Sequence, residues 1–255
     1  MELYNEEMLR SKAPAVFGEE PAEFVSDKYS FVPTFKVLGA LQEHGFRAVR
    51  AQQVTARSEK EELIGKHVVY MRHADHLNAL PEDSVPEMLV FNAHNWQTRY
   101  KLMMGVYRLI CSNGLIVADH DFGRMSRLHK GFDEDEILLA SKEFASSVEG
   151  VSEKIGSFLG HSMNEEAQRL FAADASKLRW GEQGSTYVSN LLQIRREADS
   201  DRNLWVVLNR VQENLIKGGF INPSTGRRVK HLYNIDRVRE LNEGVWSLAE
   251  ERLAA

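Results

Sequence analysis

The pattern of hydrophobic and polar positions changes along the chain near residue 130. Before that point several segments alternate at a spacing of two, which is typical of β-strands. After it, apolar residues recur every three or four positions, which is typical of amphipathic helices. We therefore predict an α+β protein with a β-rich part at residues 1–130 and a mainly helical part at residues 131–255, packed together as one compact unit.

The N-terminal part is predicted to be a helix followed by an antiparallel β-meander. Apolar spacing favours a helix over residues 32–42, and Gly45 is typical of the C-cap that ends such a helix. The segments that follow are rich in Val, Phe and Tyr and are separated by turn-forming residues. Strands are expected at residues 46–56, 67–73 and 88–96.

A helix, a turn and a strand are expected next. The helix is predicted over residues 99–110, and Asn113-Gly114 would end it before an apolar strand at residues 115–118. The helix prediction depends on one apolar stripe, which consists of Leu102, Val106 and Ile110.

The C-terminal part is predicted to be helical, with one hairpin. Long helices are expected over residues 133–173, interrupted near Gly156 or Gly160, and another helical stretch over residues 186–198. A helix at residues 202–217 would end at Gly218-Gly219. A basic hairpin at residues 220–233 and an amphipathic helix at residues 235–253 complete the prediction.

Composition indicates the cellular compartment in which the protein is expected. The chain of 255 residues has one cysteine, Cys111, so no disulfide can form within it. Its first residues are acidic and polar where a signal peptide needs a basic start and an apolar run. No stretch approaches the roughly 20 apolar residues that span a bilayer. We expect a cytoplasmic protein with no membrane contact.

The net charge of -5 conceals two locally positive segments. Residues 99–130 carry six Lys or Arg against two acidic residues, and residues 202–239 carry eight against two. Local charge is what a phosphate backbone responds to, so both segments are candidates for binding nucleic acid. The candidate side chains are Arg99, Lys101, Arg108, Arg227, Arg228, Lys230, Arg237 and Arg239.

Asn92, His94 and Asn113 form a first group of polar residues among apolar ones, with two interpretations. They could hydrogen-bond a ligand whose phosphate meets Arg99, Lys101 and Arg108. Alternatively, Asn113 supplies left-handed backbone at a helix end, and the other two satisfy turn or backbone groups. We favour the structural alternative.

Asn209, Gln212 and Glu213 form a second group, spaced so that they share one helix face. The favoured interpretation is a satisfied polar network joining this helix to the hairpin or to Asn242. The functional alternative is a phosphate-binding ridge, with an aromatic side chain for base stacking. The ridge would consist of Arg227, Arg228, Lys230, Arg237 and Arg239, beside Tyr233 or Trp246.

Enzyme chemistry receives little support from the sequence. His73, Asp75, His76 and His94 could be imagined as metal ligands, but their spacing fits no named motif. Cys111 could be a nucleophile assisted by His94, yet its apolar neighbours favour a buried thiol. No glycine-rich phosphate loop or serine-nucleophile elbow is present. We therefore assign no catalytic residue, no cofactor and no metal.

Four sequence blocks, at residues 92–95, 107–114, 204–219 and 241–250, resemble the family catalogued as domain of unknown function nine-three-two. The first block reads Asn-Ala-His-Asn, whereas the family more often has Asn-Ser-His-Asp, which puts any carboxylate role there in doubt. The resemblance implies a protein encoded on phages, prophages or plasmids, near genes for replication, recombination or antirestriction. It implies no catalytic residues.

Our leading hypothesis is therefore a mobile-element accessory protein that binds nucleic acid, with single-stranded DNA the expected form. A β-meander followed by a helix is also similar to the core of single-strand annealing proteins, which form homo-oligomers. This is analogy of fold alone. The alternative is a protein-binding inhibitor of a host defence or restriction enzyme, whose acidic segments mimic DNA. The least favoured hypothesis is a metal-dependent enzyme centred on Asn92, His94 and Arg108.

Overall fold

The computed structural model describes residues 3–25, 31–56, 58–81, 84–95, 100–109, 113–116, 134–222 and 225–254. These residues form two compact units, each assembled from separated stretches of chain. The described residues of the first unit lie within Met1–Ala79, Val85–Gly105 and His120–Glu149. Those of the second lie within Leu80–Ser84, Val106–Asp119 and Gly150–Ala255. The α+β class, with strands in the N-terminal half and helices in the C-terminal half, is confirmed.

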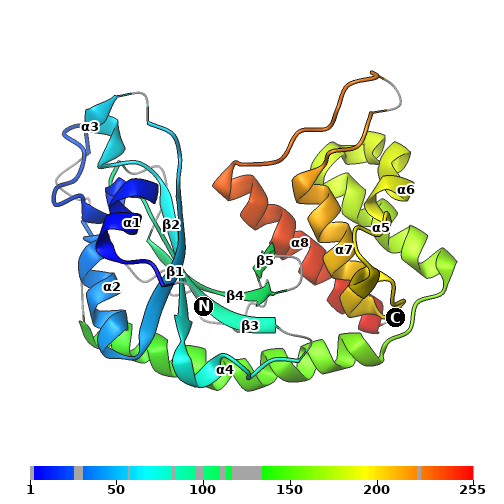
Figure 1. The fold of residues 1–255 in the computed structure, drawn as a ribbon, viewed down its shortest axis with the longest axis horizontal. Coiled ribbons are helices and arrows are strands. Elements are labelled where there is room, and N and C mark those ends of the chain that lie inside the picture. Colours follow the sequence, from blue (N-terminus) through cyan, green and yellow to red (C-terminus); the bar gives the residue numbers. More distant parts are fainter. Residues whose placement is uncertain are drawn as a thin grey trace. The chain divides into compact units, whose positions relative to one another are not determined.

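The strands follow one another across a single sheet in the order β1-β2-β3-β4-β5, as expected for a meander (Figure 1). β1 pairs antiparallel with β2, and β2 with β3, with an irregularity in β1 between Ala48 and Arg50. The strands are β1 (Phe46–Gln53), β2 (His67–His73), β3 (Ser84–Asn92), β4 (Lys101–Arg108) and β5 (Asn113–Ile116).

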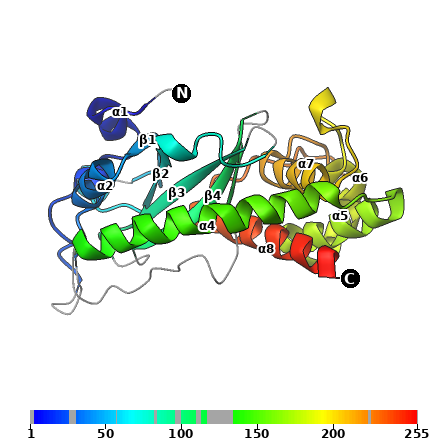
Figure 2. The same ribbon diagram turned by 90° about the horizontal axis from the view of Figure 1, so that it is seen from below.

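Helices cover the sheet in the first unit. Helix α2 (Thr34–Glu43) packs beside β1 and ends before Gly45, whose φ of 86° is the left-handed conformation predicted for it. Helix α4 (Glu134–Gly160; green in Figure 2) contributes its first part, up to Glu149, to this unit, and its Phe144 ring meets that of Phe46 in β1, centroids 5.2 Å apart. The remaining short helices are α1 (Glu6–Lys12), η1 (Pro14–Phe17), α3 (Glu59–Glu62) and η2 (Ala74–His76).

The helix predicted over residues 99–110 is wrong, because residues 101–108 form strand β4. Leu102, Val106 and Ile110 are four positions apart, a spacing that fits one face of a helix and one face of a strand equally well. The deciding pattern is the burial of the intervening Met104, which gives a period of two. Arg99 and Ile110, at the two ends of the predicted helix, lie outside the described part of the chain.

The second unit contains three helices that pack side by side: α5 (Glu165–Trp180), α7 (Leu204–Lys217) and α8 (Ile235–Ala254). Residues 204–216 of α7 are all buried, so this helix is the centre of the unit. Phe158 of α4, Trp205 of α7 and Trp246 of α8 meet through their rings in its core. Of the two predicted break points, α4 continues through Gly156 and ends at Gly160; the predicted stop at Gly218 and the closing helix are confirmed.

The helix predicted over residues 186–198 is largely wrong. This stretch contains only the end of η3 (Gly181–Tyr187), the four-residue α6 (Val188–Leu191) and the start of η4 (Glu197–Asp199). Arg195 and Arg196 each bind side chains of α7, and the backbone of Arg196 is extended, with φ -153° and ψ 157°. Tertiary bonds to α7 therefore override the local helical pattern. In the described parts of the chain, no helix is both long enough and apolar enough to cross a bilayer.

Candidate functional site

Asn92, Thr34 and His67 form a buried hydrogen-bonded chain in the first unit. The Asn92 amide donates to the Val32 carbonyl oxygen (2.9 Å) and to Thr34 Oγ1 (3.0 Å). Thr34 Oγ1 lies 2.8 Å from His67 Nε2, and His67 Nδ1 lies 2.8 Å from the Gly65 carbonyl oxygen. Because that oxygen can only accept, His67 Nδ1 carries the proton and Thr34 donates to Nε2. Each group is satisfied only with a neutral imidazole.

His94 lies beside this chain and binds a different segment. Its Nε2–H donates to the Ala15 carbonyl oxygen (2.9 Å), and its backbone N–H donates to the Ile64 carbonyl oxygen (3.0 Å). The His94 ring is fully buried against Phe31 and His67. Gly18 lies so close that an added Cβ would come within 2.8 Å of His94 Cδ2. His94 therefore ties η1 and the loop after α3 to the end of the sheet.

Burial controls the protonation of both histidines. Desolvation lowers the pKa of His67 from 6.5 to about 3, with a smaller lowering by His94. Desolvation likewise lowers the pKa of His94 from 6.5 to about 4. His67 is paired with protein groups at both ring nitrogens, whereas His94 is paired through Nε2 and its buried Nδ1 has no hydrogen-bond partner among the described residues. We assign this cluster a role in holding the first unit together.

The basic residues proposed to accompany Asn92 and His94 occupy different environments. Arg108, at the end of β4, is 1% exposed and donates to Asp199 Oδ1 (2.7 Å) within the second unit, so its charge is neutralised inside the protein. Lys101 is half-buried at the start of β4. Asn113 begins strand β5 rather than ending a helix. Arg99 lies outside the described residues, as do Cys111 and the side chain of Asn113.

The four imagined metal ligands do not form one group. His73 ends β2, the strand that His67 begins, and His94 follows the end of β3 that pairs with His67. The two ends of this seven-residue strand lie about 20 Å apart, so His73 is far from His94. His73 and His76 have ring centroids 5.1 Å apart. Across the described ranges, no three His, Cys, Asp or Glu side chains are grouped closely enough to hold a metal ion.

A second buried charge cluster in the first unit was not singled out from the sequence. Glu87 accepts two hydrogen bonds from Arg72, at 2.8 and 2.6 Å, and lies 3.4 Å from Arg50. The Arg50 guanidinium lies 3.7 Å from the centre of the Tyr70 ring. Burial raises the pKa of Glu87, an effect that the two arginines oppose. These strand residues neutralise one another across β1, β2 and β3.

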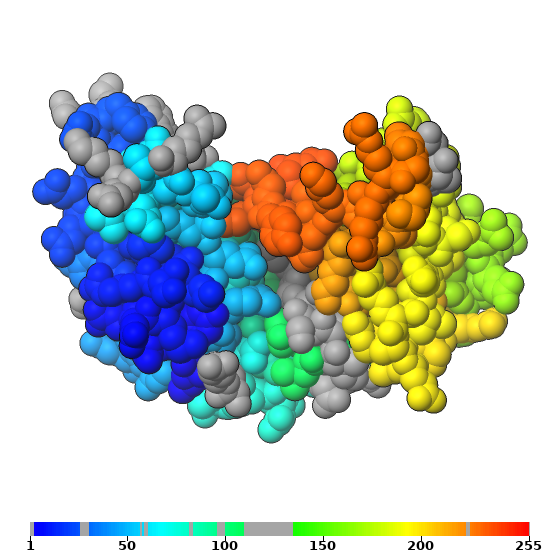
Figure 3. Space-filling model, turned by 45° about the horizontal axis from the view of Figure 1, so that its top comes forward, coloured from blue at the N-terminus to red at the C-terminus, as the bar shows by residue number. Residues whose placement is uncertain are grey.

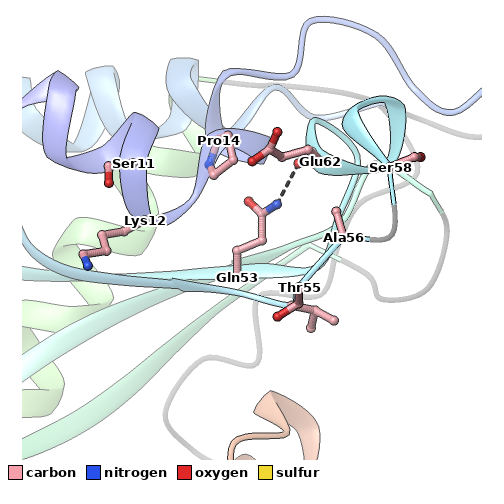
Figure 4. Close-up of a pocket in the computed structure, with 9 residues that line it drawn as sticks. Ser11, Lys12, Pro14, Gln53, Thr55, Ala56, Ser58 and Glu62 are labelled. Atoms are coloured by element: carbon pink, nitrogen blue, oxygen red, sulfur yellow. Dashed lines mark hydrogen bonds between the residues drawn. The ribbon is translucent and has the colours of Figure 1, made fainter.

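A cavity of about 350 Å³ lies between α1, the end of β1 and α3 (Figure 4). Gln53 forms part of its wall and is fully engaged, because its Nε2 donates to the Glu62 carbonyl oxygen (2.7 Å) and its Oε1 accepts from the Ala15 N–H (2.9 Å). The other lining residues are small or surface-exposed. We assign no chemistry to this cavity.

Helix α7 carries the second predicted polar group, and its contacts are internal. Gln212 Nε2 donates to Asn242 Oδ1 of α8 (2.7 Å), the partner that the structural interpretation predicts. Asn209 donates back to the Trp205 carbonyl oxygen (2.8 Å). Asn214 donates to the Leu191 and Gln193 carbonyl oxygens, both at 2.9 Å. These amides join α7 to α8 and to the chain after α6.

Glu213 is the acceptor of an ion-pair network in the second unit. Its carboxylate accepts from Arg196 at 2.8 and 2.7 Å and from Lys217 at 2.8 Å. Arg196 also binds Asp199 (2.6 Å), which in turn binds Arg108. Although burial alone raises the pKa of Glu213, the hydrogen bonds from Arg196 and Lys217 bring it below its ordinary value. The network fixes η4 against α7.

Residues 218–234, the basic segment, connect α7 to α8 and appear in orange in Figures 1 and 3. A short antiparallel bridge joins Ile221 to Arg228, as the predicted hairpin requires. Arg227, Arg228 and Lys230 are exposed. The sequence contains no acidic residue between Lys217 and Asp236. This is the longest described surface element on which exposed cations lie without acidic neighbours in sequence.

The backbone of the basic segment is anchored to the helices beneath it. Arg179 donates to the carbonyl oxygens of Leu215 and Lys230, and Arg195 donates to that of Gly218 (2.7 Å). Arg228 Nε donates to the Gly219 carbonyl oxygen (2.9 Å). The anchoring arginines therefore belong to α5 and to the chain after α6, while the exposed cations lie on the segment itself.

The arginines predicted at the start of α8 are already paired. Arg237 binds Glu240 (2.8 Å), and Arg239 binds both oxygens of Glu243, at 2.9 and 2.8 Å. Trp246, considered for base stacking, is fully buried and cannot reach a ligand. Tyr233, the other stacking candidate, is 81% exposed.

Sequence comparison identifies the family. The family model described as "Domain of unknown function (DUF932)" matches residues 21–246. The chain belongs to this family. It is also 31% identical to UPF0380 protein YfjQ and to UPF0380 protein YafZ, both of Escherichia coli (strain K12), in each case over 98% of this chain and 92% of the relative. No solved structure matches the chain.

Family membership confirms the resemblance seen in the four sequence blocks. The structure also shows where the polar residues of these blocks lie. Asn92, His94, Asn209, Gln212 and Glu213 are all buried and bonded within the protein. Thr34 and His67 were missed because their partners lie far away in sequence. A histidine inside an otherwise apolar strand was the available signal for His67.

Proposed function

We propose that this protein binds nucleic acid through the basic segment, residues 218–234, with single-stranded DNA as its ligand. The observation that carries the proposal is the exposure of Arg227, Arg228 and Lys230 on a segment without acidic residues, in a chain of net charge -5. A localised positive surface on an acidic protein attracts phosphate to one place and leaves the rest repulsive.

Some of the basic side chains that the structure describes in the second unit form ion pairs with carboxylates, and others do not. Arg108, Arg196, Arg237 and Arg239 all bind carboxylates of this chain. Among the described residues, by contrast, no carboxylate pairs with Arg227, Arg228 or Lys230. Paired cations must lose a carboxylate partner before they bind phosphate, whereas these three have no carboxylate partner to lose.

The proposal extends to a role as an accessory protein of a mobile element, acting in the cytoplasm in recombination, replication or counter-defence. The resemblance described above supports that context. The order of a β-meander followed by the long helix α4 is compatible with the annealing proteins to which we compared it, and an annealing activity on single strands would require self-association.

Charge reversal of two arginines tests the proposal. Arg227→Glu/Arg228→Glu should weaken binding of a fluorescein-labelled single-stranded oligonucleotide, measured by anisotropy, by at least tenfold at about 50 mM salt. Lys36→Glu/Arg169→Glu is the matched control, because it changes two exposed basic residues on α2 and α5 and produces the same change in net charge. This control should bind within about twofold of the unaltered protein.

Two results would remove the proposal. Equal losses in both double variants would mean that only net charge matters. If the unaltered protein does not bind at low salt, the negative net charge would instead favour the alternative function, a protein that binds and inhibits a host defence enzyme. That alternative would then be tested by mixing the protein with purified restriction enzyme.

A further inference from the structure

Tyr233 has an arrangement that the proposed phosphate contacts do not explain. At 81% exposed, it is the most exposed of the large hydrophobic side chains in the described chain. Its ring stacks on that of His231, with centroids 4.3 Å apart and an angle of 22° between the planes. One face of the tyrosine is therefore supported by protein, while the side chain as a whole remains open to solvent.

A backbone hydrogen bond fixes the segment that carries the two rings. Leu232, between them, donates its N–H to the Ile216 carbonyl oxygen at the end of α7 (2.9 Å). This bond holds the tripeptide against the helix. The ring pair is thus attached to the best-buried element of the second unit.

One proposed phosphate-binding residue directly precedes the ring pair in the sequence. Lys230 is three positions before Tyr233, and its carbonyl oxygen accepts a hydrogen bond from Arg179 (2.7 Å). His231 is near enough to Lys217 and Arg179 that both lower its pKa, after the larger effect of partial burial. A platform among cations is the combination by which proteins bind single strands: cations follow the backbone and aromatic rings stack on bases.

We propose that the Tyr233–His231 pair is a stacking platform for one unpaired base, and that it gives the basic segment its preference for single strands over duplex. This inference rests on the proposed function, and it adds that the protein recognises an unpaired base of the ligand as well as its phosphates. In a duplex the faces of the bases are already covered by neighbouring bases, so only phosphates reach the segment. In a single strand a base can turn outward and cover Tyr233.

The test separates base contacts from phosphate contacts. Anisotropy is measured with three labelled probes of equal length: a thymidine oligonucleotide, a strand of abasic sites and a duplex. The unaltered protein should bind the thymidine strand more tightly than the abasic strand. Tyr233→Ala should weaken binding of the thymidine strand by about 5- to 150-fold, the range for losing one stacked base. Its binding of the abasic strand and of the duplex should stay within twofold.

Two further variants exclude trivial explanations. Tyr233→Trp keeps a flat aromatic ring and should retain the preference for bases. Phe24→Ala removes another strongly exposed aromatic side chain, 75% exposed in the first unit, and should leave all three affinities unchanged. Circular dichroism of each variant shows whether it is folded, so a loss of binding in a folded variant is assigned to the missing side chain.

The outcomes distinguish this inference from the proposed function. If the unaltered protein binds thymidine and abasic strands equally, or if Tyr233→Ala binds the thymidine strand as the unaltered protein does, the platform is overturned. The Arg227→Glu/Arg228→Glu result would then still decide whether the segment binds phosphate. If the unaltered protein binds none of the three probes, both proposals fail together.

Discussion

Acidification should destabilise the first unit through His67 and His94. Both imidazoles are buried and neutral in the folded protein, with pKa values of about 3 and about 4, whereas the ordinary value in an unfolded chain is 6.5. Between those limits the unfolded chain binds protons that the folded chain does not, so stability falls as the pH falls. The stabilisation that each buried neutral imidazole provides is fully present above pH 6.5 and is lost as the pH falls towards the pKa of the folded state.

The size of the effect follows from these pKa values. Lowering the pH from about 7.5 to about 5.0 should cost about 2 kcal/mol for each histidine, or about 4 kcal/mol for both. Most carboxylates remain ionised over this interval, so they contribute little. The magnitude holds only if burial keeps both rings neutral while the hydrogen bonds from Thr34 to His67 and from His94 to Ala15 keep the rings in place.

Urea unfolding followed by far-ultraviolet circular dichroism at about pH 7.5, 6.0 and 5.0 measures the change. His67→Gln and His94→Gln should each reduce the pH-dependent loss by about 2 kcal/mol, whatever they do to stability at pH 7.5. His44→Gln, at the end of α2 and outside the buried cluster, serves as the control for removing a histidine. Equal pH dependence in all three variants and the unaltered protein would refute the assignment of buried, neutral histidines.

Two further predictions concern stability alone, each with a matched control. Gly45→Ala should destabilise the protein by more than about 1 kcal/mol in urea unfolding, because φ is 86° and the new Cβ would come within 2.4 Å of His73 Nε2. In the control Gly39→Ala, in α2, the new Cβ meets nothing within 4 Å, so this change should be neutral or stabilising. Glu213→Gln should cost about 1–3 kcal/mol of stability by breaking a buried ion-pair network. Its control Glu240→Gln, in an exposed ion pair, should change stability by less than about 1 kcal/mol. If a variant and its control lost the same stability, the packing described here would be contradicted.

The fold was predictable where local signals agree with tertiary packing. Gly45 and Gly218 follow helices as predicted, because both adopt the positive φ that glycine tolerates at a helix end. The strand at residues 101–108 was not predictable from its stripe, since a spacing of four satisfies both periods. Only the sheet, by burying Met104 as well, decides between them.

The candidate site was predictable in part. Arg227, Arg228, Lys230 and Tyr233 stand on a segment whose charge and composition are visible in the sequence. Burial is not visible there: Trp246 has the composition of a stacking residue but lies in the core beside Phe158. Pairing is equally hidden, because the partner of Arg108 is 91 residues away.

The salt dependence of single-strand binding by the unaltered protein tests the central claim most directly. The affinity for a labelled oligonucleotide is measured by anisotropy from about 50 to 200 mM salt, in the unaltered protein and in Arg227→Ala/Arg228→Ala. If the basic segment contacts phosphates, the logarithm of affinity falls linearly with the logarithm of salt concentration, and removing two contacts makes the slope shallower by about 1.4. Identical slopes in the two proteins would contradict the account.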